Sequence, residues 1–359
     1  MKVETLTIKN FRNYKNLSVK FVDGVNVFIG KNAQGKTNLL ESIFYCCLGK
    51  SFKSCKDKDL IKWGEEDSFI SLVANKKYRD CKVDIYLNKT QKKKVSVNGI
   101  SIRKIGDLIG EINVVFFSPQ ELRLVKESPE ERRRFMDMDI SQNNKRYFYQ
   151  LARYEKILAN RNKLLKNSQT IETVKETIDI WDRALIASAK FIATEREKFI
   201  KQILPYAQKA HSYISGGKES LELTYRCGCS INLDENFENN LEKILRKNIE
   251  KDFKLGYTTI GVHRDDIDIL LNGIEVKNFG SQGQQRTVAL SLKLAELENM
   301  KDINGEYPIL LLDDVFSELD IDRQKKLLKF VDRTQTFITC TDEKEIDGEL
   351  YKISDGTIQ

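Results

Sequence analysis

The stretch that most constrains the fold of this chain is a glycine-rich loop, GKNAQGKT, at residues 30–37. The five residues before it, VNVFI, predict a buried strand, and the residues after it, NLLESIFYCC, place apolar side chains at helical spacing. A G-x-x-x-x-G-K-[ST] pattern between a strand and a helix is typical of a phosphate-binding loop, because its glycines let successive backbone N–H groups point at phosphate oxygens. The loop therefore predicts a nucleoside triphosphate site.

The side chains of this loop have their own predicted roles. Lys36 would reach the β- and γ-phosphate oxygens, and the Thr37 hydroxyl would ligate Mg²⁺. The predicted nucleotide contacts of the loop are Gly30, Lys31, Asn32, Ala33, Gln34, Gly35, Lys36 and Thr37.

An acidic pair ends a short apolar run at residues 309–314, ILLLDD. Four apolar residues followed by two carboxylates predict a buried strand that carries the acidic partner of the phosphate-binding loop. Asp313 would hold Mg²⁺ through water, and Asp314 could orient or deprotonate the attacking water. ATP and Mg²⁺ are therefore the predicted cofactors, with Lys36 and Asp314 as the predicted catalytic residues.

A second anion-binding segment, FGSQGQQ, occupies residues 279–285 and precedes a helical stretch, VALSLKLAEL. A serine and a glycine at a helix N-terminus can bind an anion through backbone N–H groups and the helix dipole. One phosphate-binding loop and one such segment per chain indicate a site that is completed between two chains. We therefore expect a homodimer that forms on ATP.

The pattern of apolar residues divides the chain into a strand-rich part and a helical part. Residues 1–125 and 251–359 read as short strands and a few helices, with tight hairpin turns at Asn98-Gly99 and Asn272-Gly273. Ser128-Pro129 predicts a helix start with a capping box to Glu131, and helical spacing continues to about residue 250, apart from a predicted strand pair within residues 212–233. We predict one α/β domain with an added β part, from residues 1–125 together with 251–359, and an inserted, mostly helical domain at 126–250.

Composition excludes several other classes of protein. With 359 residues, 40% hydrophobic and 31% charged, the chain is typical of a globular protein, and no apolar run reaches the length of a signal peptide or a membrane span. We therefore predict a cytoplasmic location. Seven cysteines without a C-x-x-C pair, beside only two histidines, favour reduced structural thiols over a disulfide framework or a zinc site.

Basic residues are unevenly spread, and two lysine- and arginine-rich stretches lie at residues 76–94 and 123–166. Such stretches favour a polyanionic partner, although each alone also fits an ordinary solvated surface. Without a base-reading motif we expect phosphate contacts to DNA with little sequence preference. Three consecutive arginines point around a helix, so some of them must serve ion pairs. The candidate DNA contacts are Lys53, Lys56, Lys92, Lys93, Lys94, Arg132, Arg133 and Arg134.

Taken together, the loop, the acidic pair and the SQGQQ segment resemble the ABC-type ATPases, in which the signature loop of one subunit covers ATP held by the other. Ser317-Glu318-Leu319-Asp320 resembles their D-loop, and Gln120 stands where their Q-loop glutamine belongs. Two departures suggest slow hydrolysis. The catalytic glutamate is replaced by Asp314, and the strand with the switch histidine ends here in FITCT, with Thr339 or a neighbour in its place. A transporter motor is therefore disfavoured.

Longer segments narrow the resemblance to the RecF family in the SMC-type branch: NFRNY, FFSPQELRLVKESPEERRRFMD, GYTTIGVHRDDI, SQGQQRT and LLLDDVFSELD. The resemblance implies an ABC-type ATPase head with an N-terminal antiparallel β part, and a compact helical arm where SMC proteins carry a coiled coil. It places Arg12 near the nucleotide and Thr37, Gln120 and Asp313 around Mg²⁺. The residues implied to cap the partner chain's ATP are Ser281, Gln282, Gly283, Gln284 and Gln285.

The same resemblance implies a biological role. Members of this family dimerise on ATP, bind gapped DNA at the boundary of single and double strands, and act with RecO and RecR to load RecA. Weak, DNA-stimulated ATP hydrolysis would then release the DNA. A chromosome-structuring or signalling SMC-like head with a mainly protein partner remains the alternative. A small-molecule kinase is disfavoured, because it would need a lid and would leave the SQGQQ segment idle.

Overall fold

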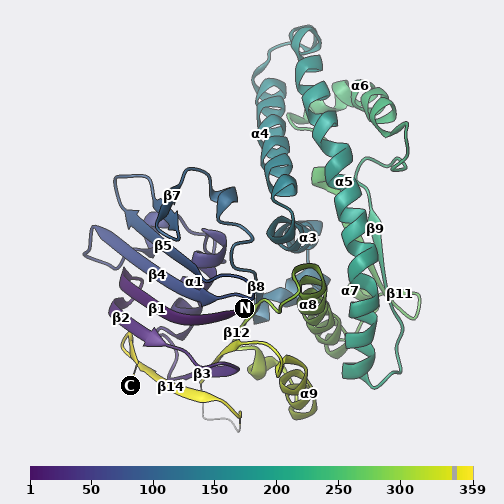
Figure 1. Cartoon of the computed structure of the whole chain (residues 1–359). Coiled ribbons are helices and arrows are strands. Elements are labelled where there is room, and N and C mark those ends of the chain that lie inside the picture. The colour runs from purple at the N-terminus through teal and green to yellow at the C-terminus, as the bar shows by residue number, and fades with distance from the viewer. Residues whose placement is uncertain (342–345, 359) are drawn as a thin grey trace. The chain divides into compact units, whose positions relative to one another are not determined.

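The computed structural model describes residues 1–341 and 346–358, and the chain divides into two compact units (Figure 1). The first unit comprises Met1–Leu122, Tyr213–Gly216 and Leu290–Gln359, and the second comprises Arg123–Ser212 and Gly217–Ala289. The predicted helical insertion ended at residue 250, whereas the second unit continues to Ala289 because strands beyond residue 250 pair within it.

The first unit contains a six-stranded, mainly parallel sheet that carries the phosphate-binding loop. Its strand order is β15-β14-β3-β13-β12-β8, and the central pairs are parallel. Because parallel strands end at one edge, the segments that follow β3, β12 and β13 come together there. The strands are β3 (Val25–Ile29), β8 (Val114–Phe117), β12 (Ile309–Asp313), β13 (Thr336–Cys340), β14 (Glu349–Ser354) and β15 (Thr357–Ile358).

An antiparallel sheet of six strands forms the rest of the β part, in the order β2-β1-β4-β5-β6-β7. These strands are β1 (Lys2–Phe11), β2 (Tyr14–Lys20), β4 (Asp67–Asn75), β5 (Cys81–Asn88), β6 (Lys94–Val97) and β7 (Ile100–Ile102). Helix α1 (Lys36–Leu48) contacts strands of both sheets and is buried along nearly its whole length. The predicted Asn98-Gly99 turn is confirmed, since both residues have positive φ, 51° and 78°.

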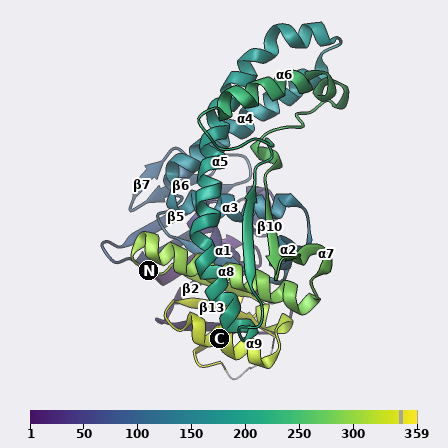
Figure 2. The same cartoon turned by 90° about the vertical axis from the view of Figure 1, so that its right-hand side faces the viewer.

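Helices dominate the second unit, and three of them pack together (Figure 2). An apolar cluster of Leu165, Val174, Ile178 and Ile249 joins α4, α5 and α6. The main helices are α3 (Pro129–Asn143), α4 (Lys145–Asn167), α5 (Ile171–Ser215), α6 (Phe237–Leu255) and α8 (Gln282–Asn304), of which α5 ends and α8 continues in the first unit. The short helices of the chain are α2 (Arg123–Lys126), α7 (Val276–Phe279), α9 (Ile321–Val331), η1 (Asp57–Leu60), η2 (Ile105–Asp107), η3 (Pro119–Leu122), η4 (Val262–Arg264) and η5 (Val315–Glu318).

Two local predictions for the second unit were wrong. Residues 212–233 contain one strand rather than a pair: β9 (Leu221–Arg226) pairs with β10 (Asp266–Leu271), which also pairs with β11 (Ile274–Glu275). Helix α3 begins after Ser128 with Pro129 in its first turn, as predicted, but the Ser128 side chain makes no capping hydrogen bond among the described residues. The Glu131 N–H donates instead to the Ser128 carbonyl oxygen at 3.2 Å.

Two buried arginines organise the polar interior of the second unit. Arg161 donates to Asp182 at 2.6 Å and to Asp252 and Thr258 at 2.8 Å. Arg196 donates to Asp137, to Asp265 at 2.6 Å and to the carbonyl oxygen of Val262 at 2.6 Å. Thr258, Val262 and Asp265 lie in the GYTTIGVHRDDI segment, so hydrogen bonds from α4 and α5, one of them part of an ion pair, hold this segment in place.

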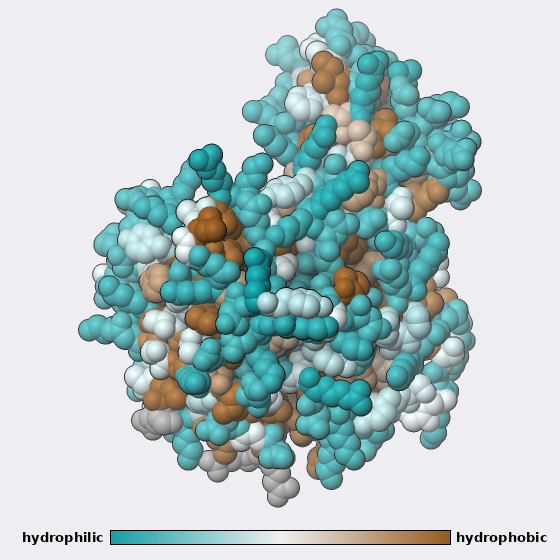
Figure 3. Space-filling model, in the orientation of Figure 1, coloured by the Kyte–Doolittle hydropathy of each residue, from teal (hydrophilic) through white to brown (hydrophobic). Residues whose placement is uncertain are grey.

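The surface of the chain is mostly hydrophilic on the face that Figure 3 shows, with hydrophobic side chains in small separate groups. Scattered apolar side chains of this kind are ordinary for a globular protein. Within the described part of the chain, no helix has the length and apolar character needed to span a membrane.

Candidate nucleotide-binding site

The glycine-rich loop runs from the end of β3 to the start of α1, as the sequence predicted, and its neighbours leave little room. A Cβ atom at Gly30 would lie 2.3 Å from the carbonyl oxygen of Ile353, and one at Gly35 would lie 2.5 Å from Asn13 Nδ2. Gly35 also has a φ of +117°, which side chains disfavour. Packing therefore requires glycine at both positions, and at Gly35 the backbone conformation requires it as well.

Hydrogen bonds from distant parts of the chain fix the loop. The Asn13 side chain donates to the Gln34 carbonyl oxygen at 2.8 Å, and the Tyr14 hydroxyl donates to that of Gly35 at 3.1 Å. Asp355 N–H donates to Gln34 Oε1 at 2.6 Å, and Gly356 N–H to the Gln34 carbonyl oxygen at 3.1 Å. Hydrogen bonds from the β1–β2 turn and from the β14–β15 turn thus both hold the loop at Gln34.

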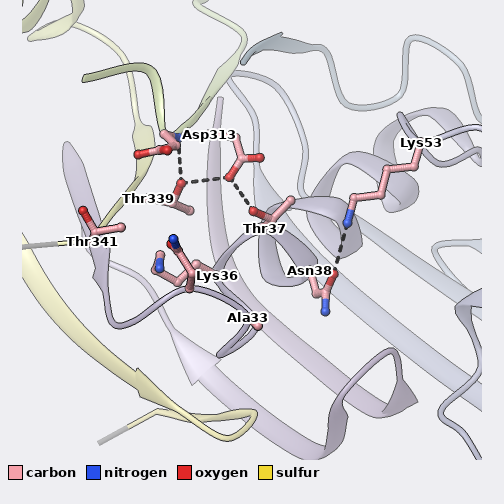
Figure 4. A pocket seen from close by; sticks show the side chains of 11 residues that line it. Ala33, Lys36, Thr37, Asn38, Lys53, Asp313, Thr339 and Thr341 are labelled. Atoms are coloured by element: carbon pink, nitrogen blue, oxygen red, sulfur yellow. Dashed lines mark hydrogen bonds between the residues drawn. The ribbon is translucent and has the colours of Figure 1, made fainter. Parts of the chain in front are cut away.

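A pocket of about 270 Å³ opens over the loop (Figure 4). Its lining comes from the loop, from the start of α1, from Lys53, and from the ends of β12 and β13. The lining residues are Asn32, Ala33, Gly35, Lys36, Thr37, Asn38, Lys53, Asp313, Asp314, Thr339 and Thr341. The structure therefore brings the predicted loop and the predicted acidic pair to one cavity.

Asp313 is the centre of the polar contacts in this pocket (Figure 4). The hydroxyls of Thr37 and Thr339 each donate to Asp313 Oδ1 at 2.8 Å, and the Asp314 N–H donates to Thr339 Oγ1 at 2.9 Å. Burial raises the pKa of Asp313, while the two threonine hydroxyls lower it in part. A threonine hydroxyl beside a carboxylate offers the hard oxygen ligands that Mg²⁺ prefers.

Lys36 and Asp314 also line this pocket. The Lys36 ammonium donates to the carbonyl oxygens of Gly30 and Lys31, the second at 2.9 Å, so it is held over the loop. Asp314 is exposed at the pocket, and its φ of 52° turns the chain sharply after β12. A cation and a carboxylate at these places could bind phosphate and orient water, respectively.

Arg12 forms a two-point ion pair with Glu41 of α1, at 2.9 and 2.8 Å, and donates to the Asp59 carbonyl oxygen at 3.0 Å. Burial alone would lower the pKa of the Arg12 guanidinium, but Glu41 raises it above the ordinary value. The Glu41 side chain is fully buried. Arg12 is therefore anchored to the helix that follows the loop, and its contact with a nucleotide stays a prediction.

The predicted Q-loop and D-loop residues are not among the described residues that line the pocket. Gln120 is exposed in η3 and is not among the described residues that line the pocket. Ser317 donates to the Asp314 carbonyl oxygen at 2.7 Å, and Asp320 caps α9 by accepting from the Arg323 N–H at 2.9 Å. Leu319 is buried, and the side chain of Glu318 lies outside the described part of the chain.

In the second unit, the SQGQQ segment forms a reciprocal cap at the start of α8. The Ser281 N–H donates to Gln284 Oε1 at 2.8 Å, and the Gln284 N–H donates to Ser281 Oγ at 3.2 Å. The N–H groups of Gln282 and Gly283 belong to the first turn, where no intrahelical acceptor exists. Gln285 is buried and donates to backbone oxygens of α7, so it faces inward.

The structure corrects the set of candidate DNA contacts. Arg132 is buried, with Nε 2.5 Å from Asp266 Oδ1, so it cannot present its charge to DNA in this structure. Arg133 is partly buried and donates to the Asp265 carbonyl oxygen at 2.8 Å. Lys93 forms an ion pair with Asp57 at 3.1 Å, and Lys53 lines the nucleotide pocket. Of the eight, the exposed ones outside the pocket are Lys56, Lys92, Lys94 and Arg134.

Three residues near the site were missed in the sequence: Asn13, Asn38 and Glu41. Asn38 Nδ2 donates to Asn13 Oδ1 at 2.9 Å, and Lys53 donates to Asn38 Oδ1 at 3.2 Å. The sequence offered one signal that Glu41 has a buried ionic partner: it is the one charged residue in the mostly apolar stretch LLESIFYCC. Asn13 lies in the NFRNY segment that carries the family resemblance, but no periodic pattern predicted the contacts of Asn13 or Asn38.

The buried carboxylate of Asp313 makes a testable prediction about stability. Because its pKa is raised above 3.8, the folded chain binds this proton more readily than the unfolded chain, and the ionised form costs stability at higher pH. Asp313→Asn is expected to raise the melting temperature of the nucleotide-free protein at neutral pH by about 2 °C or more. This gain in melting temperature should shrink as the pH falls through the raised pKa of Asp313 toward the ordinary value. At every pH the Asp313→Asn variant is expected to bind ATP more weakly in the presence of Mg²⁺.

Thermal unfolding at a series of pH values, with ATP binding measured in parallel, checks this prediction. Asp80→Asn, at an exposed position in the same unit, is the matched control and should shift the melting temperature little. A destabilised Asp313→Asn protein at neutral pH would show that the threonine contacts outweigh the burial of the charge.

Comparison with known proteins places the chain among close relatives. Residues 2–349 match the family model described as the RecF/RecN/SMC N terminal domain. The chain is 47% identical to the DNA replication and repair protein RecF of Clostridium novyi (strain NT), over 100% of this chain and 99% of that protein. It is 44% identical to the protein of the same name from Clostridium perfringens (strain 13 / Type A), over the full length of both.

Solved structures agree with the sequence comparison. The recombination mediator protein RecF-ATPrS of the RecFOR pathway superposes with a TM-score of 0.93 at 35% identity, covering 99% of this chain and 97% of that one. The Smc head domain of Pyrococcus furiosus has a TM-score of 0.58 at 16% identity and covers 100% of this chain and 95% of that one, which shows the fold alone. The predicted α/β ABC-type head with an antiparallel β part and a helical insertion is confirmed.

Proposed function

This chain belongs to the RecF family of DNA replication and repair proteins, an ABC/SMC-type ATPase family, and from that premise we propose that it is an ATP-driven homodimeric clamp on DNA. The observation that carries the proposal is that the chain holds one phosphate-binding loop, in the first unit, and one second anion-binding segment, Ser281 to Gln285, which forms a capped helix start in the second unit. In the proposed dimer, the segment of one chain would cover the nucleotide held on the loop of the other.

In the proposed dimer, each side chain of the pocket has one task. The loop N–H groups and Lys36 bind the phosphates, while Thr37 and Asp313, already in contact at 2.8 Å, would hold Mg²⁺. The metal ion neutralises charge that develops on the phosphates. Asp314 orients the attacking water. The Asp314 backbone N–H donates to Thr339 Oγ1 at 2.9 Å, which fixes the position of Asp314. A short carboxylate and a threonine in place of a histidine support slow, DNA-stimulated hydrolysis that opens the clamp.

The proposed DNA ligand is a gapped molecule, bound at the junction of single and double strands. Exposed Lys56, Lys92, Lys94 and Arg134 are the remaining candidates for phosphate contacts. RecO and RecR are the proposed protein partners, and loading of RecA is the proposed outcome, because two solved RecF structures that are 35% identical to this chain are described as belonging to the RecFOR pathway.

The function is tested by measuring the mass of the wild-type protein in solution with and without Mg²⁺ and ATP. We expect monomers without nucleotide and dimers with ATP, and tighter binding to gapped DNA than to duplex of the same length. Affinity should fall linearly on a log–log plot against salt. Equal mass with and without ATP would contradict the clamp, whereas an ATP-dependent dimer that ignores gapped DNA would favour the alternative of a mainly protein partner.

The geometry of the SQGQQ segment adds a prediction about Glu219. Gln284 Nε2 donates to Glu219 Oε1 at 2.8 Å, and Glu219 Oε2 lies 3.0 Å from Nε2 of buried His211. Glu219→Ala removes the anchor of the Gln284 side chain. We expect ATP binding by the monomer to be unchanged, while the ATP concentration needed for dimerisation rises by about 10-fold or more, because a hydrogen bond to a charged group is worth about 1.5–3 kcal/mol.

Nucleotide titration and mass measurement on the same protein separate these two effects. Glu222→Ala is the matched control, because Glu222 lies exposed on β9, three residues after Glu219. A Glu219→Ala protein that dimerises like the control would show that Gln284 needs no support from Glu219.

A further inference from the structure

Two cysteines, Cys227 and Cys229, lie in one tight turn directly after β9. The Ser230 N–H donates to the Cys227 carbonyl oxygen at 3.1 Å, which closes a β-turn with Gly228 and Cys229 at its centre. Consecutive Cα atoms lie about 3.8 Å apart, so residues two apart in such a bend have Cα atoms about 5–6 Å apart, within the disulfide range of about 4.4–6.8 Å. The turn therefore holds two thiols at a spacing that a disulfide can bridge.

Packing fixes the backbone of this turn. A Cβ atom at Gly228 would lie 2.5 Å from the carbonyl carbon of Arg264, and the Gly228 N–H donates to Asp265 Oδ1 at 2.7 Å. Asp265 also accepts from Arg196 at 2.6 Å, so the turn is joined to the buried ion pairs of the second unit. Tertiary structure therefore holds the two thiols near each other.

The two thiols differ in exposure and in acidity. Cys227 is half-buried, whereas Cys229 is fully buried. A hydrogen bond with the Cys229 thiol lowers the pKa of the Cys227 thiol, although burial raises it in part, and the same hydrogen bond together with burial raises the pKa of Cys229. The thiolate is the nucleophilic form of cysteine, so Cys227 is the thiol suited to attack a molecule from solvent, while Cys229 stays protonated.

The other cysteines lack this combination. All seven lie in the described part of the chain, and of these Cys55 and Cys227 are half-buried and the other five are buried. Cys46 and Cys47 are neighbours in α1, but both are fully buried, and burial raises the pKa of each. Cys227 therefore combines access from solvent with a second thiol in its own turn, an arrangement typical of cysteines that peroxides oxidise.

We propose that Cys227 and Cys229 are an oxidation site, at which a hydroperoxide converts the two thiols to a reversible intramolecular disulfide. With hydrogen peroxide, the Cys227 thiolate attacks one oxygen, the O–O bond breaks, and the released hydroxide takes up a proton, which leaves Cys227 sulfenic acid and one water. The Cys229 sulfur then attacks the Cys227 sulfur, the S–O bond breaks, and the Cys229 proton leaves with the hydroxyl group as a second water. The two thiols together lose two electrons, and the peroxide gains them.

A disulfide across so short a loop is expected to be labile. Closing a ring over residues 227–229 removes little entropy from the unfolded chain, so the bond adds little to the stability of the fold. Strained disulfides have more oxidising potentials than structural ones, so cellular thiols reduce them readily. The pair is therefore a dithiol in a reducing environment and a disulfide while peroxide is present.

Peptide mapping by mass spectrometry tests the proposal, because trypsin cleaves after Arg226 and Lys243 and leaves both cysteines in one peptide, 227–243. The reduced full chain is exposed to hydrogen peroxide in its folded state, and the thiols that remain are alkylated after unfolding. A small free thiol in the same solution reports the dose of peroxide. Cys46 and Cys47 are the internal control for a buried pair.

Before exposure, peptide 227–243 should carry an alkyl group on each of its cysteines. After exposure it should carry none and weigh two hydrogen atoms less, and dithiothreitol should restore both alkylation sites. Cys46 and Cys47 should stay alkylated throughout. In Cys229→Ser, dimedone, which traps sulfenic acids, should label Cys227, whereas in Cys227→Ser the buried Cys229 should remain a thiol.

Three results would overturn the proposal. The first is that peptide 227–243 keeps both alkyl groups at a dose of peroxide that has consumed the small free thiol. The second is that Cys46 and Cys47 lose their thiols as fast as Cys227 and Cys229, which would show that peroxide reaches all of them only after unfolding. The third is dimedone labelling of Cys229 in Cys227→Ser, which would make the buried thiol the nucleophile. The first two results come from the wild-type chain, so they stand even where a variant fails to fold.

Discussion

Lys36→Met is expected to abolish ATP-dependent dimerisation and to weaken ATP binding by about 100-fold or more. The Lys36 ammonium is held over the loop by the carbonyl oxygens of Gly30 and Lys31, at the place where phosphate oxygens would lie. Charged hydrogen bonds are worth about 1.5–3 kcal/mol each, and two such bonds to phosphate oxygens account for a loss of this size. Methionine keeps the length and apolar stem of the side chain but carries no charge.

Equilibrium dialysis with labelled ATP and mass measurement in solution check both parts of this prediction. Lys31→Met is the matched control, because Lys31 belongs to the same loop but is exposed and does not line the pocket. The control should keep its affinity within a factor of a few, since the backbone N–H remains. Normal dimerisation of Lys36→Met with ATP would contradict the assignment of the phosphate site.

Arg196→Met is expected to destabilise the second unit by about 3–5 kcal/mol. Arg196 is buried and bridges two carboxylates, Asp137 at 2.9 Å and Asp265 at 2.6 Å. Its removal leaves Asp265, whose side chain is fully buried, with hydrogen bonds from Tyr225 and Gly228 but without its cation. Burial already raises the pKa of Asp265 while Arg196 lowers it, so the loss of the arginine raises this pKa further.

The pH dependence of this effect has a definite sign. When pH falls below the raised pKa of Asp265 in the variant, the carboxyl binds a proton and the unpaired charge disappears. The destabilisation should therefore be largest at neutral pH and smaller in acid. Urea unfolding followed by Trp181, in a Trp63→Phe background, reports on the unit that contains Arg196.

The control for this variant is Arg246→Met, which breaks an exposed pair with Glu242 one helical turn away. Exposed pairs of this kind contribute about 0.3–0.5 kcal/mol, so the control should unfold nearly as the parent does. Equal stability of the two variants would show that the network around Arg196 is not needed for the fold.

Local sequence patterns predicted the parts of the site that depend on near neighbours. The strand, loop and helix around residues 30–37, the carboxylates after β12 and the Asn-Gly turns follow from periodicity and turn chemistry. The S-x-x-E/Q pattern shows the limit of this reasoning. It occurs at Ser128 and at Ser281, yet only Ser281 forms the reciprocal cap.

Contacts between distant residues could not be predicted from one sequence. Arg132 is buried because Asp266, 134 residues away, accepts its hydrogen bonds on β10. The β9–β10 pair and the ion pair of Arg12 with Glu41 have the same origin. In each case tertiary packing decides which distant residue or strand becomes the partner. Composition and residue spacing do not predict that packing.

The contact of the β14–β15 turn with loop 30–37 has a consequence for protein synthesis. Gln34 and Asp355 are separated by 321 residues, and β3 has only β13 and β14 as its neighbours in the sheet. At about 5–20 residues per second, a ribosome needs roughly 15–60 s to translate the intervening chain. For most of that time β3 has neither of its native sheet partners, because β13 and β14 lie within the last residues of the interval, so the nascent chain acquires a nucleotide pocket only near the end of its translation.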